Sequence, residues 1–281
     1  MINSLRNRLV RLLYLKIERI SNSRWYNSPF GEKPLAPKSE YLNLAAKASS
    51  KSYPEIDSFE DELGFSIDKD WLDELALHTQ VVVKSSELCY QHGRILYTTL
   101  SKYINEYLVQ DAGDRLTIWE TGTARGFSAL CMAKAMVDQE SHGTIITFDV
   151  LPHSTQMYWN CIDDHDGPKS RAELLEPWKD LVKRYIVFHQ GDTRLEMPKV
   201  QAERIHFAFL DGAHTYDDVF FEFDQIGDRQ KSGDMIVYDD YTPKQFPGIV
   251  KAVDKICEEY KYHRTALKAH GGRGYMVTEK K

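Results

Sequence analysis

Three aspartates follow two apolar segments in the C-terminal half of the chain. Asp211 comes directly after the run Phe207–Leu210, and the pair Asp239 and Asp240 follows the run Met235–Tyr238. If both runs are neighbouring parallel strands, their carboxylates meet at one edge of the sheet. Carboxylates packed this closely repel one another unless a proton or a cation lies between them. The pattern predicts a divalent-cation site, Mg²⁺ being the first choice, although one or two of the acids could instead cap helices.

A histidine lies three residues after the first of these acids. An imidazole has a pKa near working pH, so His214 is a candidate general base next to Asp211. The alternative is a residue at the start of a helix with a satisfied hydrogen bond. We take His214 and Asp211 as the candidate catalytic residues.

A glycine-containing turn marks a second site. The segment Glu120–Gly126 has the pattern E-x-G-x-x-x-G and lies between an apolar run and a helical pattern. At Gly122 the absence of a Cβ would let the backbone approach a ligand, and Gly126 would let the following helix pack on the strand. The pattern lacks the second glycine of a dinucleotide fingerprint, which disfavours a dehydrogenase. A tight strand–helix turn without a ligand is the alternative.

The next predicted strand also ends in an acid. Asp149 follows the run Thr144–Phe148, and a carboxylate in this position can accept both hydrogen bonds from a ribose diol. A surface acid or a helix cap is the plainer interpretation. The order of glycine turn, helix and strand-end acid favours the ribose.

Seven short β-rich runs alternate with helical patterns from residue 116 onward. Strands separated by helices indicate βαβ units and a doubly wound, mainly parallel α/β sheet. The close spacing of the last two runs predicts a terminal hairpin. The predicted strands are Leu116–Glu120, Thr144–Val150, Tyr185–Gln190, His206–Asp211, Asp234–Asp239, His263–Leu267 and Gly274–Thr278.

These motifs together resemble a known family. The turn resembles motif I of the class I S-adenosylmethionine-dependent methyltransferases. The segments F-L-D-G-A-H-T-Y and Y-D-D-Y resemble the metal-dependent O-methyltransferases, most closely the macrolide and aminocoumarin sugar O-methyltransferases and the cephalosporin-hydroxylase-like family. The resemblance covers Leu116 to Thr278. Catechol-type relatives differ in carrying Asp-Asn where this chain has Asp239-Asp240, and a lysine where it has His214.

The resemblance implies a cofactor, a metal and their ligands. S-adenosylmethionine would be the methyl donor, with Asp192 accepting a hydrogen bond from the adenine amino group or, alternatively, only stabilising its own turn. A divalent metal would bind the acceptor hydroxyl. The implied cofactor residues are Glu120, Gly122, Thr123, Gly126, Ser128, Asp149, Asp192 and Thr193, and the implied metal ligands are Asp211, Asp239 and Asp240.

We therefore expect methyl transfer from S-adenosylmethionine to a hydroxyl of a sugar or glycan-containing molecule. The long segment Leu151–Arg184 carries aromatic and acidic residues that would suit a sugar, but Trp159 and Trp178 could equally pack a local helix. The alternatives are a catechol-like phenol as acceptor, metal-free transfer to nitrogen, and a non-catalytic membrane-associated subunit.

The first 100 residues are predicted to form a helical extension, followed by the methyltransferase domain in residues 101–281. Residues 5–20 have the pattern of a basic amphipathic helix, which would dock on the core, on a second subunit or on an anionic membrane surface. Asn22–Pro54 has the composition of an extended arm, Asp68 would cap a helix, and Gly93–Tyr107 would form another.

Composition narrows the remaining choices. The net charge of −6 gives no basic excess for nucleic-acid binding. Four scattered cysteines suit free thiols in a reducing compartment. No apolar run reaches the roughly 20 residues of a membrane span, so a cytoplasmic protein is expected, with peripheral membrane contact and a homo-oligomer left open.

Overall fold

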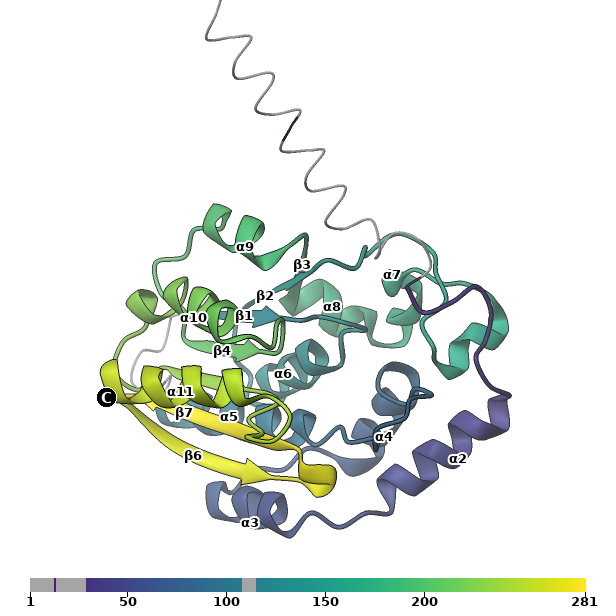
Figure 1. The fold of residues 1–281 in the computed structure, drawn as a ribbon, viewed down its shortest axis with the longest axis horizontal. Helices are drawn as coiled ribbons and strands as arrows, with labels where there is room; N and C mark the ends of the chain where they lie inside the picture. Colours follow the sequence, from purple (N-terminus) through teal and green to yellow (C-terminus); the bar gives the residue numbers. More distant parts are fainter. Residues whose placement is uncertain (1–12, 14–28, 108–114) are drawn as a thin grey trace, which may run out of the picture.

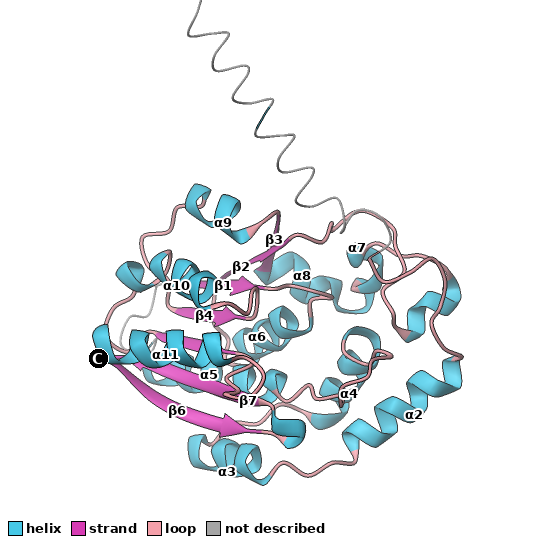
Figure 2. Cartoon of the chain, viewed as in Figure 1, coloured by secondary structure: helices cyan, strands magenta, loops and turns pink. Residues whose placement is uncertain are grey.

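A seven-stranded sheet forms the centre of the computed structural model, which describes Leu13 and residues 29–107 and 115–281 (Figures 1 and 2). The strand order is β3-β2-β1-β4-β5-β7-β6. The first five strands are parallel, and β7 runs antiparallel to both β5 and β6. This confirms the predicted doubly wound sheet and its terminal hairpin. The strands are β1 (Leu116–Thr121), β2 (Gly143–Asp149), β3 (Ile186–Gln190), β4 (Phe207–Leu210), β5 (Met235–Tyr238), β6 (Tyr262–Lys268) and β7 (Gly274–Lys280).

The central strands are apolar at almost every position because both faces of the sheet are covered. In β4, Phe207 and Phe209 pack into one core cluster, whereas Ala208 and Leu210 pack into the other. A parallel strand with helices on both faces has no solvent-facing side, so alternation with polar residues disappears. This explains why these strands appear in the sequence as short apolar runs.

Helices cover the two faces in separate layers (Figure 1). The first layer holds α5 and α6 against the sheet, with the N-terminal helices and α8 packed around them, and α10 and α11 cover the opposite face. The helices are α2 (Lys38–Ser49), α3 (Pro54–Leu63), α4 (Lys69–Thr79), α5 (His92–Tyr107), α6 (Phe127–Asp138), α7 (Arg171–Leu174), α8 (Lys179–Tyr185), α9 (Thr193–Glu196), α10 (Tyr216–Asp224) and α11 (Pro247–Glu259). Short 3₁₀ turns occupy Ile162–Asp166, Glu176–Trp178, Met197–Lys199, Gly227–Arg229 and His270–Gly272.

The prediction of an extended arm over Asn22–Pro54 is wrong, because α2 lies inside it. Tyr41 and Ala48 of this helix are buried, and Ala45 packs against the same core cluster. Their spacing of four and three residues is the apolar stripe of a helix, which the surrounding polar residues obscured. The predicted cap of α4 is confirmed, since Asp68 accepts a 2.8 Å hydrogen bond from the backbone N–H of Trp71.

The N-terminal helices share one core with the sheet. Tyr41, Ile56 and Leu72 belong to the same buried cluster as Leu100 and Ile118. The expected boundary between residues 100 and 101 falls inside α5. The amphipathic helix expected over residues 5–20 lies outside the part of the chain that the structure describes, except for Leu13.

Two compositional expectations can also be compared with the structure. Cys89, Cys131, Cys161 and Cys257 are all buried and free. Across residues 29–107 and 115–281, no helix is both long and apolar enough to cross a lipid bilayer.

Candidate active site

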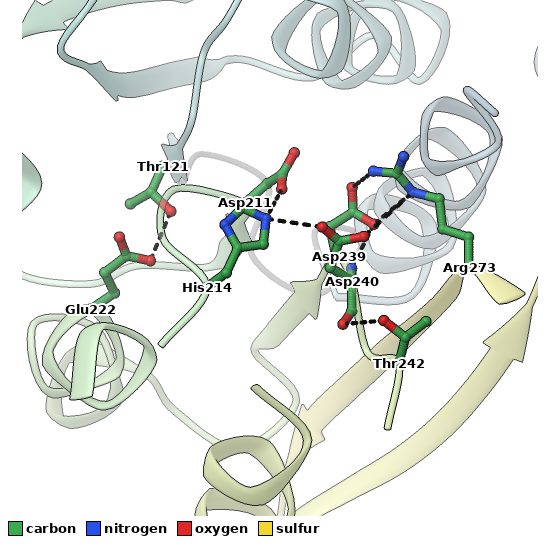
Figure 3. A network of polar contacts seen from close by, with 8 residues as sticks. All are labelled: Thr121, Asp211, His214, Glu222, Asp239, Asp240, Thr242 and Arg273. Atoms are coloured by element: carbon green, nitrogen blue, oxygen red, sulfur yellow. Dashed lines mark hydrogen bonds and ion pairs between the residues drawn. The ribbon is translucent and has the colours of Figure 1, made fainter. Parts of the chain in front are cut away.

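The carboxyl ends of β1, β4 and β5 bring the two predicted sites together. Thr121 pairs with Leu210, and Leu210 pairs with Tyr238 in the parallel register. The glycine turn after β1 therefore lies next to Asp211, and Asp211 lies next to the pair after β5. Figure 3 shows the side chains at this edge, with His214 between Asp211 and Asp240.

The glycines of the turn are required by the protein itself. Gly122 has a φ of 88°, and a Cβ there would overlap the carbonyl oxygen of Asp211. Gly126, with a φ of 91°, would place a Cβ 2.8 Å from the side chain of Leu175. The physical reason thus differs from the expected approach to a ligand, because the first glycine lets two neighbouring turns pack closely and the second makes room for a leucine.

A buried polar layer supports this turn. Glu120 is fully buried, and burial raises its pKa to about 7, while the nearby hydroxyls of Ser128 and Thr147 lower it. Thr147 donates a hydrogen bond to Glu120, and the hydroxyls of Thr147 and Thr123 are bonded to each other. Glu120, Thr123 and Ser128 are all buried, so they fix the shape of the turn from the interior.

Asp149 fastens the turn to the end of β2. Its carboxylate accepts hydrogen bonds from the backbone N–H of Ala124 at 2.5 Å and of Leu151 at 2.7 Å. Nη2 of Arg171 lies 3.5 Å from the same carboxylate. Burial raises the pKa of Asp149, and the charge of Arg171 opposes that shift. Each carboxylate oxygen retains a lone pair, so Asp149 can still accept further hydrogen bonds.

Asp192 caps a helix. Its Oδ1 accepts a 2.9 Å hydrogen bond from the backbone N–H of Arg194 at the start of α9. Asp192 therefore stabilises its own turn, which was the alternative to an adenine contact. The neighbouring Thr193 contributes to the surroundings of Glu222, whose pKa its hydroxyl lowers.

The acidic group at the other side of the edge contains a histidine. His214 Nε2 lies 2.9 Å from Asp240 Oδ2 and 3.9 Å from Asp211 Oδ1. One potential ligand atom from each of the three residues lies within 4.8 Å of the other two. A single cation or a single transferred proton can be shared by groups this close.

Asp239 lies beside this group and pairs with Arg273 (Figure 3). Arg273 donates to Asp239 Oδ2 at 2.6 Å and to Oδ1 at 3.4 Å, and the backbone N–H of Asp240 also bonds to Oδ1 at 2.7 Å. The Asp239 side chain is 0% exposed. The expected three-aspartate arrangement is thus not what the structure brings together, since both oxygens of Asp239 already have donors.

A strained backbone conformation sets the direction of the Asp240 side chain. Asp240 has a φ of 54°, a left-handed conformation that is unusual for a residue other than glycine. Its carbonyl accepts hydrogen bonds from the backbone N–H of Thr242 at 2.6 Å and from the hydroxyl of Thr242 at 3.1 Å. The abrupt turn after β5 places Asp239 against Arg273 and leaves Asp240 between His214 Nε2, at 2.9 Å, and Arg273 Nε, at 3.7 Å.

The charges of the group follow from these contacts. Burial, together with the carboxylates of Asp239 and Asp240, raises the pKa of Asp211 well above its usual range. The pKa of Asp239 is lowered because the Arg273 guanidinium outweighs the effect of burial. The hydrogen bond to Asp240 raises the pKa of His214. The ionised form is therefore favoured at Asp239, whereas Asp211 favours its protonated form unless a cation is near.

Three residues of the candidate site were not identified from the sequence. Arg273 lies in the glycine-rich turn before β7, and Arg171 lies in the long segment after β2. Glu222 on α10 is buried, and its Oε2 accepts a 2.9 Å hydrogen bond from the Thr121 hydroxyl. Burial raises the pKa of Glu222 to about 8. In the sequence, Glu222 could have been found as a charged residue on an otherwise apolar face of the α10 helix.

The long segment after β2 turns its aromatic residues inward. Trp159 is 1% exposed and Trp178 is 7% exposed, so neither can stack on a sugar in this conformation. Asp163 pairs with His78 at 2.6 Å, and Asp164 accepts a 2.8 Å hydrogen bond from the backbone N–H of Trp159. Trp159 and Trp178 therefore pack locally, which was the alternative to a sugar-binding role.

Comparison of the chain with models of protein families finds a match to one domain. Residues 119–241 match a family model described as a methyltransferase domain, which is less than half of the chain. No curated protein sequence matches the chain.

Solved structures with the same fold are distant in sequence. Cofactor-bound Rv0187 from MTB is 16% identical with a TM-score of 0.53, covering 82% of this chain and 98% of that one. An O-methyltransferase from Bacillus cereus, solved in complex with SAH, is 19% identical with a TM-score of 0.51 and coverage of 80% and 97%. The O-methyltransferase TomG from Streptomyces achromogenes, solved with SAM, is 15% identical with a TM-score of 0.50 and coverage of 79% and 94%.

The sheet topology and these similarities define the class of the protein. It has the fold of the class I S-adenosylmethionine-dependent methyltransferases, with a helical N-terminal region. Residues 119–241 match the model of a methyltransferase domain. This domain contains the glycine turn, Asp149, Asp211, His214 and the Asp239–Asp240 pair.

Proposed function

We propose that this protein transfers a methyl group from S-adenosylmethionine to a hydroxyl of a sugar-containing acceptor, with the help of a divalent cation. The observation that carries the proposal is the position of the Gly122 turn directly beside the Asp211, His214 and Asp240 group. A donor held at the turn and an acceptor held at the acidic group would be neighbours across two adjacent strands. Such proximity is the main requirement for an in-line methyl transfer.

The cofactor half of the proposal uses the edge formed by β1 and β2. Gly122 and Thr123 form the floor under the methionine part, and Asp149 accepts hydrogen bonds from the ribose hydroxyls. Asp192 and Thr193 at the end of β3 border the adenine. The sulfonium of S-adenosylmethionine supplies the electrophilic methyl group, so the protein only has to align the two reactants and handle a proton.

The residues present fit a cation only in part. Asp211 and Asp240 offer two carboxylates, a donor set that hard divalent ions prefer. Asp239 does not fit, because its oxygens are held by Arg273 and by a backbone N–H. We propose that Asp211 and Asp240 hold the cation and that Asp239 acts as the counter-ion of Arg273. A bound divalent cation would lower the pKa of a hydroxyl that it contacts.

His214 is the proposed general base. Its imidazole is half-exposed, at 38% of the side chain, and so can be reached by an acceptor. The bond from Nε2 to Asp240 holds the ring in a fixed orientation. His214 Nε2 is also close enough to Asp211 and Asp240 to serve as a third ligand, and the two roles predict different behaviour.

Replacing His214 by alanine separates these roles. If His214 is the base, H214A loses turnover but binds Mn²⁺ as tightly as the wild type by calorimetry. If it is a ligand, Mn²⁺ affinity falls together with turnover. Matched measurements with Asp240→Asn should show weaker metal binding in either case.

Fewer observations support the proposed sugar acceptor than support the cofactor. The segments 207–216 and 238–241 resemble the sugar O-methyltransferases, whereas the inward-facing tryptophans remove the stacking surface that was expected for a sugar. A catechol-like phenol is therefore the second candidate. Methyl transfer from labelled S-adenosylmethionine to a panel of hydroxylated glycans and catechols distinguishes the two.

The complete proposal is tested with three measurements on the full chain. Calorimetry should detect S-adenosylhomocysteine binding, EDTA should abolish methyl transfer, and Mg²⁺ or Mn²⁺ should restore it. Failure to bind S-adenosylhomocysteine rejects the enzyme. Methyl transfer that resists EDTA rejects only the role of the cation. In that case the His214–Asp240 pair remains the proposed base, and Arg273 is the positive charge next to it.

A further inference from the structure

We propose that Arg171 is a cofactor-positioning residue, which holds Asp149 and the turn at Ala124 in the geometry that receives the ribose of S-adenosylmethionine. The inference deepens the proposed function and rests on its cofactor site. It assigns a role to the long segment between β2 and β3, which brings Arg171 on α7 to this edge of the sheet.

A closed set of contacts joins Arg171 to the cofactor edge. Arg171 Nε donates a 2.8 Å hydrogen bond to the carbonyl of Ala124, and Nη2 lies 3.5 Å from Asp149 Oδ2. The same Oδ2 accepts the 2.5 Å hydrogen bond from the N–H of Ala124. Ala124 is thus held through both its N–H and its C=O, and the carboxylate is held from two sides.

The turn needs this support because Ala124 is strained. Its φ of 45° is left-handed, a conformation that is unfavourable for a residue with a Cβ. Such a conformation persists only where the surroundings fix it. Asp149 and Arg171 are the groups that bond to Ala124 in this way.

The guanidinium itself is locked in the interior. Arg171 is 1% exposed and lies between two rings, with Cζ 5.7 Å from the centre of Trp159 and 5.6 Å from that of Phe188. A planar guanidinium can stack between rings and donate in two fixed directions, whereas an ammonium cannot. The inward-facing Trp159 therefore has a function in this account, since it orients Arg171.

One donor of this buried group has no hydrogen bond. Nη2 of Arg171 is buried and makes no hydrogen bond, although it lies 3.5 Å from Asp149 Oδ2 as an ion pair. Burial of a cationic donor without a hydrogen bond is costly, and such groups commonly mark a functional site. A tightened contact to Asp149 when ribose hydroxyls bind would satisfy it.

The charges around Asp149 depend on Arg171. Glu120 faces Asp149 from β1, and its carboxyl opposes ionisation of the pair. Arg125 on the turn and His153 on the segment after β2 face Arg171, and burial lowers the pKa of His153 to about 4, so His153 is neutral at pH 7. Arg171 is the cation that opposes the burial-raised pKa of Asp149 and so favours its ionised form, and an ionised carboxylate is the stronger acceptor for a ribose diol.

The experiment is calorimetry of S-adenosylhomocysteine binding at pH 6, 7 and 8 with the wild type, R171K and R171M. For R171M we expect binding about 30-fold weaker at pH 7, a deficit that grows at pH 6 and shrinks at pH 8, as expected if Asp149 takes up a proton. R171K should restore part of the affinity. Turnover at saturating S-adenosylmethionine should change less than its KM.

A matched control separates this role from general stability. Arg94 on α5 also pairs with carboxylates, Asp57 at 2.7 Å and Glu60, and both partners lie on α3 rather than at the cofactor turn. R94M should lower the melting temperature and leave binding at every pH unchanged.

The outcomes are separable. Absence of binding by the wild type rejects the proposed function and this inference together. Binding by the wild type with unchanged affinity in R171M, or with the same loss at every pH in R171K and R171M, overturns this inference alone. If R171M does not fold, R171K decides, with an expected deficit of about 5-fold that grows towards pH 6.

Discussion

At the scale of single residues, the acidic edge is organised by opposite charges that come from distant parts of the chain. Asp239 and Asp240 are adjacent in sequence, and Arg273 lies against both, at 2.6 Å from Asp239 and 3.7 Å from Asp240. His214 bonds to Asp240 at 2.9 Å. The Arg273 guanidinium offsets the burial of the Asp239 carboxylate and lowers the pKa of Asp239. This arrangement makes Arg273 as important for the edge as the aspartates themselves.

Removal of Arg273 should therefore destabilise the protein strongly. R273Q leaves the fully buried Asp239 carboxylate without its counter-ion, which is expected to cost about 3–5 kcal/mol. Unfolding in urea measures the change. Arg264 provides the control, because its pair with Asp254 is exposed and R264Q should cost less than about 1 kcal/mol. Equal losses in the two variants would contradict the importance of the buried pair.

Glu222 should make stability depend on pH. Its pKa is raised by burial to about 8, so the folded state retains a proton that the unfolded chain releases near its ordinary pKa of about 4.3. The resulting penalty is absent below about pH 4, grows as pH rises, and is complete above about pH 8. E222Q should be more stable than the wild type at pH 8 by roughly 1–4 kcal/mol and should show little difference at pH 4.5. A parallel pH dependence in both proteins would show that Glu222 is not the group responsible.

At the scale of elements, the site depends on how closely two strand-end turns approach each other. The β1–α6 turn and the loop after β4 meet at Gly122, where no side chain fits beside the carbonyl of Asp211. The same contact sets the distance between the proposed donor and acceptor sites. A small backbone shift here moves both halves of the site.

Alanine at Gly122 tests this contact. G122A should lose about 3 kcal/mol or more of stability, because it combines backbone strain with a clash against a buried backbone. It should also abolish binding of S-adenosylhomocysteine. Gly64 is the matched control, since its φ of 78° is similar but no atom lies within 4 Å of the added Cβ. G64A should lose only about 1 kcal/mol and retain binding. If G122A and G64A behave alike, strain alone explains the glycine.

At the scale of the whole molecule, the N-terminal helices and the sheet form one cooperative unit. Helices α2, α3 and α4 contribute to the same buried cluster as α5, α6 and one face of the sheet. Residues 119–241, which match the methyltransferase domain, are therefore only part of the folding unit. The amphipathic helix expected over residues 5–20 remains a prediction, as does its contact with a membrane or a second subunit.

Truncation should reveal this dependence. A chain that begins at residue 92 exposes Ile95, Leu100 and Leu130, which are 0% exposed in the full structure. We expect it to lose the cooperative thermal transition, whereas a chain that begins at residue 29 keeps it. Circular dichroism during heating measures both. A sharp transition in the shorter chain would place the domain boundary near the one expected from the sequence.

The sequence alone determined the order of elements and the position of the chemistry along them. Apolar runs such as Phe207–Leu210, the glycine turn and the strand-end acids are local patterns, and a parallel sheet necessarily brings the carboxyl ends of its strands to one edge. All seven strands, the terminal hairpin and the cap at Asp68 could be predicted for this reason. The helix α2 was missed because its apolar stripe is narrow and interrupted by polar residues.

The tertiary structure decided which of these groups act together. The partners of Asp239 and Asp149 are Arg273 and Arg171, which come from later parts of the chain, and nothing in the local pattern indicates which arginine will reach which carboxylate. The direction of the Asp240 side chain depends on a left-handed backbone conformation that is usual only for glycine, so the sequence does not indicate it. Local preferences fix where a side chain is attached, whereas burial and long-range charge pairing fix where it points.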